Sequence, residues 1–171
     1  SGIEHFLDHF TKYIATKEYP EDFGARVYKI SHDDQGNRLT HLKITGGLLK
    51  VKSLISEDEK VDQIRIYSGN KFTTVDKIEA GNVCAIKGFK NIQAGQGLGF
   101  EKDEISPVLS SYMDYRIILP DNCDQHKMLA NLQLLAQEDP QLHIVYDSFS
   151  QEIHIQLMGA IQIEVLKNII K

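Results

Sequence analysis

The chain has 171 residues, a net charge of −5 and 42% hydrophobic side chains. This composition is typical of globular proteins and excludes a disordered, collagen-like or coiled-coil chain. Residues 1–103 carry 15 basic and 15 acidic side chains, whereas residues 104–171 carry 4 basic and 9 acidic ones. Any contact with nucleic acid is therefore expected to be local. With two cysteines, no long apolar run and no signal peptide, we expect a cytoplasmic protein without membrane contact.

The first part of the chain predicts one helix and then a small barrel. Apolar side chains recur with helical spacing over residues 3–14, which indicates an amphipathic helix. From residue 24 to about residue 100, apolar and polar residues alternate in short segments separated by turns rich in Gly, Asn and Asp. The segments are 24–31, 37–45, 48–55, 61–68, 72–80, 82–89 and 97–100. Short antiparallel strands at this regular spacing predict a small β-barrel.

The pattern changes to mixed α and β after the polar run at residues 101–104 and Pro107. Strands are predicted at 115–119, 142–147 and 152–157, and helices at 124–138 and 160–170. Asp121 or Asn122 is the expected cap of the first helix. The order β-α-β-β-α is one strand short of a ferredoxin-like unit. The fold class is thus multi-domain: an antiparallel β-barrel, then a ferredoxin-like α+β domain lacking its last strand. We expect the natural chain to continue beyond residue 171.

Residue spacing predicts no catalytic or metal site. The sequence has no Walker phosphate loop, and the glycines of residues 95–99 are interpreted as a turn because no helix follows them. Cys123 and His126 lie three residues apart, but zinc needs a second pair of ligands. The turn that holds Glu57, Asp58 and Glu59 is expected to leave all three solvated. Cys84, in an apolar strand, is expected to be buried.

Lysines of the predicted barrel are the one local electrostatic feature. They are Lys43, Lys50, Lys52, Lys87 and Lys90. Lys50 and Lys52 are expected to share one face of the strand at 48–55. Lysines on one barrel face can contact phosphates, and the alternative is that they only confer solubility.

Two stretches of the predicted barrel resemble translational GTPases. Residues 36–50 (GNRLTHLKITGGLLK) are similar to the G-R-L-x…S-G-x-L-x motif of that family's barrel. Residues 78–83 (IEAGNV), followed by Gly88-Phe89 and residues 95–99 (GQGLG), are similar to its I-x-A-G-x-I…G-L…G-x-x-L stretch. The chain departs from the pattern at Val51-Lys52, which stand where the family usually has glycine.

A third stretch resembles the third domain of elongation factor G. Residues 135–140 (LAQEDP), with Leu142 and the later Met158-Gly159, are similar to its L-A-x-E-D-P…(M/L)-G segment. Residues 159–165 (GAIQIEV) are similar to G-K-V-Q-M-E-V of the tetracycline-resistance ribosomal protection branch. Elongation factor G has G-E-L-H-L there. The resemblance therefore favours the ribosomal protection branch.

The resemblance implies a domain assignment. Residues 1–20 are the terminal helix of a G domain plus a linker, residues 21–103 are the domain II barrel, and residues 104–171 are a truncated domain III. The family's nucleotide-binding motifs belong to the G domain. We therefore expect no catalytic residue, cofactor or metal in this chain, and GTP with magnesium is implied only for the missing G domain.

The resemblance also implies function and partners. The parent protein would be a GTPase whose hydrolysis drives conformational change and release from the ribosome. Small-subunit rRNA, a ribosomal protein and its own G domain are the implied partners, and the chain is expected to be a monomer. The five lysines then become candidate contacts with rRNA.

Two alternatives stay open. One is a stand-alone RNA- or protein-binding barrel module with no GTPase activity. The other is a small hydrolase on the α+β half with Arg116 as an anion clamp, although no nucleophile can be placed beside it.

Overall fold

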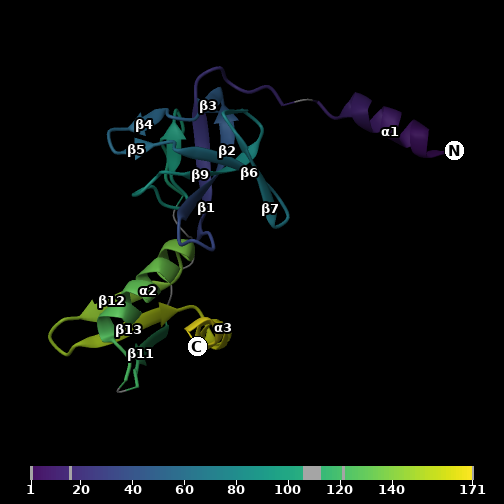
Figure 1. The fold of residues 1–171 in the computed structure, drawn as a ribbon. Helices are drawn as coiled ribbons and strands as arrows, with labels where there is room; N and C mark the ends of the chain where they lie inside the picture. Colours follow the sequence, from purple (N-terminus) through teal and green to yellow (C-terminus); the bar gives the residue numbers. More distant parts are fainter. Residues whose placement is uncertain (1, 16, 106–112, 121, 171) are drawn as a thin grey trace.

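The computed structural model describes residues 2–15, 17–105, 113–120 and 122–170. Helix α1 (Gly2–Tyr13) comes first and stands away from the rest of the chain (Figure 1). It is amphipathic as predicted, yet it has no buried residue. Its apolar stripe is more than half exposed and consists of Ile3, Phe6, Leu7, Phe10 and Ile14. In the described ranges, no helix has the length and hydropathy that a membrane span requires.

Ten short strands build the barrel that follows. They are β1 (Gly24–His32), β2 (Arg38–Gly46), β3 (Leu48–Lys50), β4 (Leu54–Ser56), β5 (Glu59–Lys60), β6 (Gln63–Ser68), β7 (Lys71–Val75), β8 (Lys77–Glu79), β9 (Val83–Lys87) and β10 (Gly97–Gly99). The main sheet has the order β10-β1-β2-β9-β6-β7, and β3-β8 and β4-β5 form two small ladders. All pairs are antiparallel. This confirms the predicted barrel.

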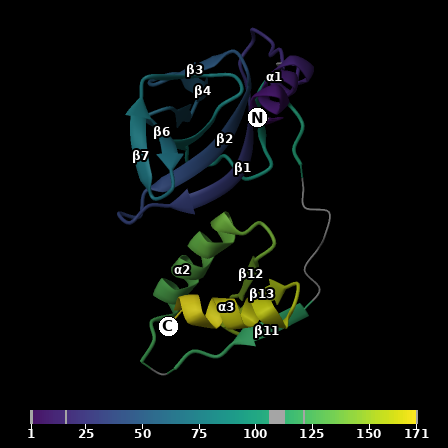
Figure 2. The same cartoon turned by 90° about the vertical axis from the view of Figure 1, so that its right-hand side faces the viewer.

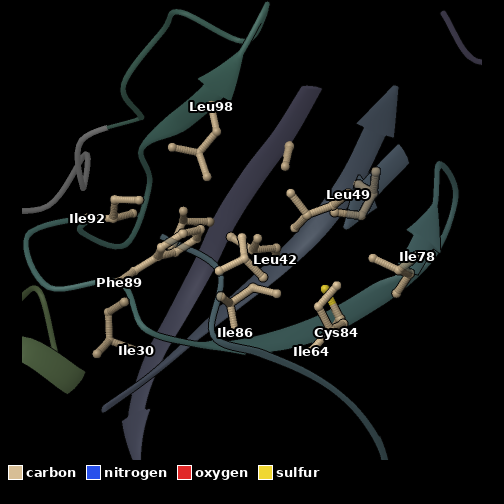
Figure 3. Packing of buried hydrophobic residues seen from close by; sticks show 14 residues of the cluster. Ile30, Leu42, Leu49, Ile64, Ile78, Cys84, Ile86, Phe89, Ile92 and Leu98 are labelled. Atoms are coloured by element: carbon tan, nitrogen blue, oxygen red, sulfur yellow. The ribbon is translucent and has the colours of Figure 1, made fainter. Parts of the chain in front are cut away.

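Alternation along the strands explains the barrel core. On β2, Leu42 and Ile44 point inward, and His41 and Lys43 lie on the opposite face. Side chains from the other strands meet them in one cluster, including Ile64 and Ile86 (Figure 3). Cys84 belongs to the same cluster, as the sequence predicted, and burial raises the pKa of its thiol to about 12.

The predicted strand at 48–55 is wrong, because the structure breaks it in two. β3 ends at Lys50, and Lys52 adopts a φ of 70°, in the left-handed region that favours glycine. The amide of Lys52 instead donates to the carbonyl of Val61 across the turn. Lys50 and Lys52 therefore do not share a strand face. The predicted strand at 72–80 is likewise divided, between β7 and β8.

Glu59 corrects the prediction that all three carboxylates of its turn are solvated. Its side chain is buried, at 4% exposure. One carboxylate oxygen accepts a hydrogen bond from the amide of Lys90 and the other from the amide of Asn91, both at 2.7 Å. Glu57 and Asp58 are exposed, as expected. A buried carboxylate is tolerated here because backbone donors of the loop after β9 replace water.

The α+β unit follows the barrel. It comprises β11 (Met113–Ile117), α2 (Gln125–Glu138), β12 (His143–Asp147), β13 (Glu152–Leu157) and α3 (Ala160–Ile170). The sheet order β11-β13-β12 is antiparallel throughout, as expected for the ferredoxin-like unit. Alternate residues Ile153, Ile155 and Leu157 of β13 pack with side chains of both helices. Both helices therefore cover the same face of the sheet (Figure 2).

The cap of α2 differs from the prediction. Asp124 is the N-cap, and its carboxylate accepts hydrogen bonds from the amides of His126 and Lys127 at 2.9 and 3.2 Å. Asn122 is not the cap, and Asp121 lies outside the described residues. Asp121, Asn122 and Asp124 are all residue types that cap helices, and the helix starts after the last of these three.

Candidate nucleic-acid interface

The outer face of the six-stranded sheet is formed by the strand residues that alternate with the core. It carries Arg26, Tyr28, Lys29, His41, Lys43, Arg65, Tyr67, Phe72, Ala85 and Lys87. A β-bulge on β1 enriches this face. Val27 pairs with Leu42 and Lys29 with His41, so Tyr28 is the extra residue of the bulge. Both Tyr28 and Lys29 are exposed.

The five predicted lysines do not gather on one face. Lys43 and Lys87 lie on the outer face of the sheet, on β2 and β9. Lys50 lies on β3 opposite Lys77, and Lys52 is in the turn beyond β3. Lys90 lies in the loop after β9. The structure thus brings two of the five together with other cations of the sheet.

Lys43 and Lys87 differ in their contacts. The Lys43 ammonium donates a hydrogen bond to the carbonyl of Gly81, which ties part of its charge to the barrel. Lys87 has no ion pair within the described part of the chain, and its side chain is half-buried. An unpaired ammonium on a sheet surface can approach a phosphate with little reorganisation.

Sequence reasoning missed a row of aromatic rings on the same outer face. Tyr28 and His41 have ring centroids 5.9 Å apart, His41 and Tyr67 6.2 Å, and Tyr67 and Phe72 5.4 Å. We call these four residues the aromatic row. They come from β1, β2, β6 and β7 (Figure 2). Because strand pairing alone joins them, no local pattern predicts the row.

Ala85 makes the row continuous. β9 lies between β2 and β6, and Ala85 pairs with His41 on one side and Arg65 on the other. Its methyl group is fully buried although it is not part of the barrel core. The small side chain lets the ring of His41 lie near the ring of Tyr67 across β9.

Arg65 fixes one end of the row. Its guanidinium lies 4.4 Å from the centroid of Phe72 and 3.0 Å from the Asp33 carboxylate. Burial alone raises the pKa of Asp33, but hydrogen bonds from Asn37, Arg65 and Gln35 outweigh it and lower the pKa to about 2. The charge of Arg65 is therefore already compensated, and its role is to hold the ring.

The junction between the barrel and the α+β unit is polar and small. His32 Nδ1 lies 2.6 Å from the Glu138 carboxylate of α2. Arg38 Nε donates to the side-chain oxygen of Gln137 at 3.3 Å, and the same guanidinium donates to the carbonyls of Phe89 and Ile92. These contacts connect the loop after β9 to the end of α2.

A cleft of about 820 Å³ opens beside this junction. Arg38 and Lys90 of the barrel line one side, and Gln133 and Gln137 of α2 line the other. Its walls are mixed polar and apolar and hold no convergent nucleophile and base. It lies between the barrel and the α+β unit.

The glycine-rich residues 95–99 do not fit a nucleotide phosphate. The amide of Gly95 donates to the carbonyl of Val27, and the amide of Gln96 to that of Gln93. A Cβ at Gly95 would lie 2.2 Å from the carbonyl oxygen of Ile105, and one at Gly99 2.0 Å from that of Phe23. The glycines are required for chain crossings in the barrel. The described residues also hold no cluster of three or more potential metal ligands.

The remaining candidates of the α+β unit are occupied by structural contacts. Arg116 pairs with Glu152 at 2.6 Å, which compensates the charge that an anion clamp would need. Cys123 and His126 lie at the start of α2, where Asp124 caps the helix. This geometry gives no support to a hydrolase.

The fold is shared with a solved structure. A crystal structure of a Thermus thermophilus protein matches 99% of this chain and 27% of its own, with a TM-score of 0.74 and 17% identity. At that identity the match establishes the fold alone. It covers the barrel and the α+β unit together.

Sequence comparison shows which known proteins this chain resembles. Residues 110–171 match the model for Elongation Factor G, domain III. The chain is 26% identical to tetracycline resistance protein TetP of Clostridium perfringens over 99% of its length, and 28% identical to elongation factor G of Amoebophilus asiaticus (strain 5a2) over 91%. The resemblance to elongation factor G-like translational GTPases is thereby confirmed. The chain spans about a quarter of these relatives, 27% and 23% of their lengths.

Proposed function

We propose that this chain is the ribosome-binding and signal-relaying part of an elongation factor G-like translational GTPase of the tetracycline-resistance ribosomal protection type. The observation that carries the proposal is one continuous match, through both the barrel and the α+β unit, to TetP and to an elongation factor G. A stand-alone barrel module would need only the barrel to match.

In this proposal the parent protein binds GTP and magnesium in a separate G domain. Hydrolysis there changes domain packing and drives release from the ribosome. The barrel docks on small-subunit rRNA, with Lys43, Lys50, Lys52, Lys87 and Lys90 as candidate phosphate contacts. The α+β unit, whose sequence is acidic, contacts a ribosomal protein and the G domain.

The small polar junction supports a relay between the two units. Few side chains hold it, among them His32, Arg38, Gln137 and Glu138. Interfaces between domains that are small and polar allow relative motion. A change in the G domain can therefore alter the angle between barrel and α+β unit without unfolding either.

Cosedimentation with purified ribosomes tests the proposal. The 171-residue chain should pellet with ribosomes at low salt, and an excess of intact elongation factor G should displace it. Binding should weaken as salt rises, because phosphate contacts release counterions. A chain that stays in the supernatant at micromolar concentration and low salt contradicts the proposal. Reading the gene upstream of residue 1 for a Walker loop separates the parent GTPase from the stand-alone module.

A further inference from the structure

We propose that the aromatic row binds a single-stranded segment of RNA by stacking unpaired bases on its rings, while Lys29, Lys43 and Lys87 contact the phosphates. The identification of this RNA as ribosomal rests on the proposed function, but the binding chemistry does not.

Exposure of the rings is the first argument. Tyr28, at the bulge of β1, is 52% exposed, and Tyr67 and Phe72 are 39% and 44% exposed above a filled core. The rings do not contribute to that core, so their exposed faces are available to a ligand. Aromatic rings that stand in a line on a β-sheet surface are platforms for nucleic-acid bases, because every base has a π-face.

Rigidity of the row is the second argument. Arg65 lies over the ring of Phe72 and is held by Asp33 and by the side chain of Gln63 at 2.7 Å. His41 Nε2 lies 2.8 Å from the hydroxyl of Ser31. Rings that are positioned before binding lose little conformational entropy when a base stacks on them.

Charge on the same face is the third argument, and it favours RNA over a protein. The acidic groups around this face are already paired: Asp33 with Arg65, Glu101 with Arg26, and Glu138 of α2 with His32. Three strands instead place a lysine beside a ring or beside Ala85. On β1 Lys29 follows Tyr28, on β2 Lys43 lies two residues from His41, and on β9 Lys87 lies two residues from Ala85. Protein-binding patches are depleted in lysine, whereas lysines on a sheet face suit phosphates.

His41 fits this surface as a neutral ring. Burial and the nearby charge of Lys29 lower the pKa of His41, and Glu138 of α2 opposes the shift only in part. A neutral imidazole can stack in the same way as the neighbouring phenol rings. Glu138 also pairs with His32, so the α+β unit contributes one carboxylate near His41.

The test compares Tyr67→Ala with Tyr115→Ala in the full chain. Both tyrosines are 39% exposed and lie on strands, but Tyr115 is on β11 of the α+β unit. Binding of a short fluorescein-labelled oligouridylate is measured by fluorescence anisotropy at several salt concentrations. Tyr67→Ala should weaken binding about tenfold, and Tyr115→Ala should leave it unchanged. Tyr67→Phe should restore binding, because stacking needs the ring and not the hydroxyl.

Lys87→Ala provides the second readout. It should make the negative slope of log K against log salt shallower by about one. Tyr67→Ala should lower the affinity without changing that slope. Thermal melts of each variant verify that the barrel remains folded. The proposal is overturned if the wild-type chain does not bind the oligouridylate, or if Tyr67→Ala and Tyr115→Ala bind it equally.

Ribosome cosedimentation of the same variants separates this proposal from the proposed function. If the wild-type chain pellets with ribosomes and Tyr67→Ala pellets equally well, the aromatic row is not the contact and the proposed function stands. If the chain binds oligouridylate through Tyr67 but never pellets with ribosomes, the row binds RNA and the proposed function fails. Loss of pelleting in Tyr67→Ala, without oligouridylate binding by the wild type, would show a protein contact and overturn the RNA proposal.

Discussion

The barrel and the α+β unit differ in how completely each encloses a core. The barrel buries a cluster of fourteen side chains inside a sheet that curves around them. Among its described residues the α+β unit buries a cluster of five, and its helix α3 has no buried residue. Its helices cover one face of a three-stranded sheet, and Val145 and Tyr115 remain exposed. Because buried apolar area is the main source of stability, the barrel is expected to be the more stable unit.

This difference separates two roles along the chain. The barrel offers a rigid sheet whose outer face can present fixed side chains to a ligand. The α+β unit has a small core and a small junction, so its position responds more readily to what it touches. Passing a conformational change from one domain to another needs one unit that stays fixed on its ligand and a second unit whose position can change.

The largest expected loss of folding stability comes from replacing one core isoleucine by alanine in each unit. Ile64→Ala in the barrel should cost about 3 kcal/mol and leave the barrel folded. Ile153→Ala removes the same atoms from a core of five buried residues and should unfold the α+β unit while the barrel persists. Two-dimensional NMR spectra with urea titration follow the two units separately. A single transition shared by both units would contradict the difference between them.

Glu59→Gln should have the next largest effect, confined to the barrel. The amide has one acceptor oxygen in place of two and turns an N–H donor toward a backbone N–H, so one buried amide loses its partner. The expected cost is about 2 kcal/mol. Glu57→Gln, at an exposed position of the same turn, is the matched control and should change stability by less than about 0.5 kcal/mol. Faster hydrogen exchange at Lys90 and Asn91 should accompany only the first substitution.

Alternation of apolar residues was enough to predict most strands, because a sheet with one buried face imposes that pattern directly. The helix at 160–170 was predicted with the bounds that the structure has. Alternation alone did not predict the break after Lys50, because Lys52 is not a glycine; the glycine that the family usually has at Val51-Lys52 was the one sign of a left-handed backbone there. Two-residue strands such as β5 are too short to show a period.

The candidate interface was predictable only in part. Lysine positions are visible in the sequence, but their faces depend on strand breaks and on the bulge at Tyr28. The aromatic row joins residues of four strands through pairings that are distant in sequence, and Ala85 matters only because of its neighbours on β2 and β6. The buried carboxylate of Glu59 depends on a loop about 30 residues away along the chain, at Lys90 and Asn91.

Acid should weaken the barrel through Asp33. The pKa of Asp33 is lowered to about 2 in the folded chain, below the value of about 3.9 for an unfolded aspartate. A lowered folded pKa contributes stability that is fully present above about pH 4 and is lost as the pH falls toward 2. Asp33→Asn should remove this part of the acid dependence, and Asp34→Asn, at the neighbouring position of the same turn, should not. Urea midpoints of the barrel transition between about pH 5 and pH 2 measure both; equal curves for the two variants would exclude the Asp33 contribution.

The junction should show the smallest effect, because barrel and α+β unit meet through few polar groups. The pair of His32 and Glu138 has side chains that are 17% and 35% exposed, so solvent screens it. A double-mutant cycle with His32→Ala and Glu138→Gln should give a coupling of about 0.5 kcal/mol. The unfolding midpoint of each unit should stay within error of the wild type, while hydrogen exchange at the C-terminal turn of α2 becomes faster. A coupling above about 2 kcal/mol would mean that the two units behave as one body, and the barrel could then not serve as a fixed surface against which the second unit moves.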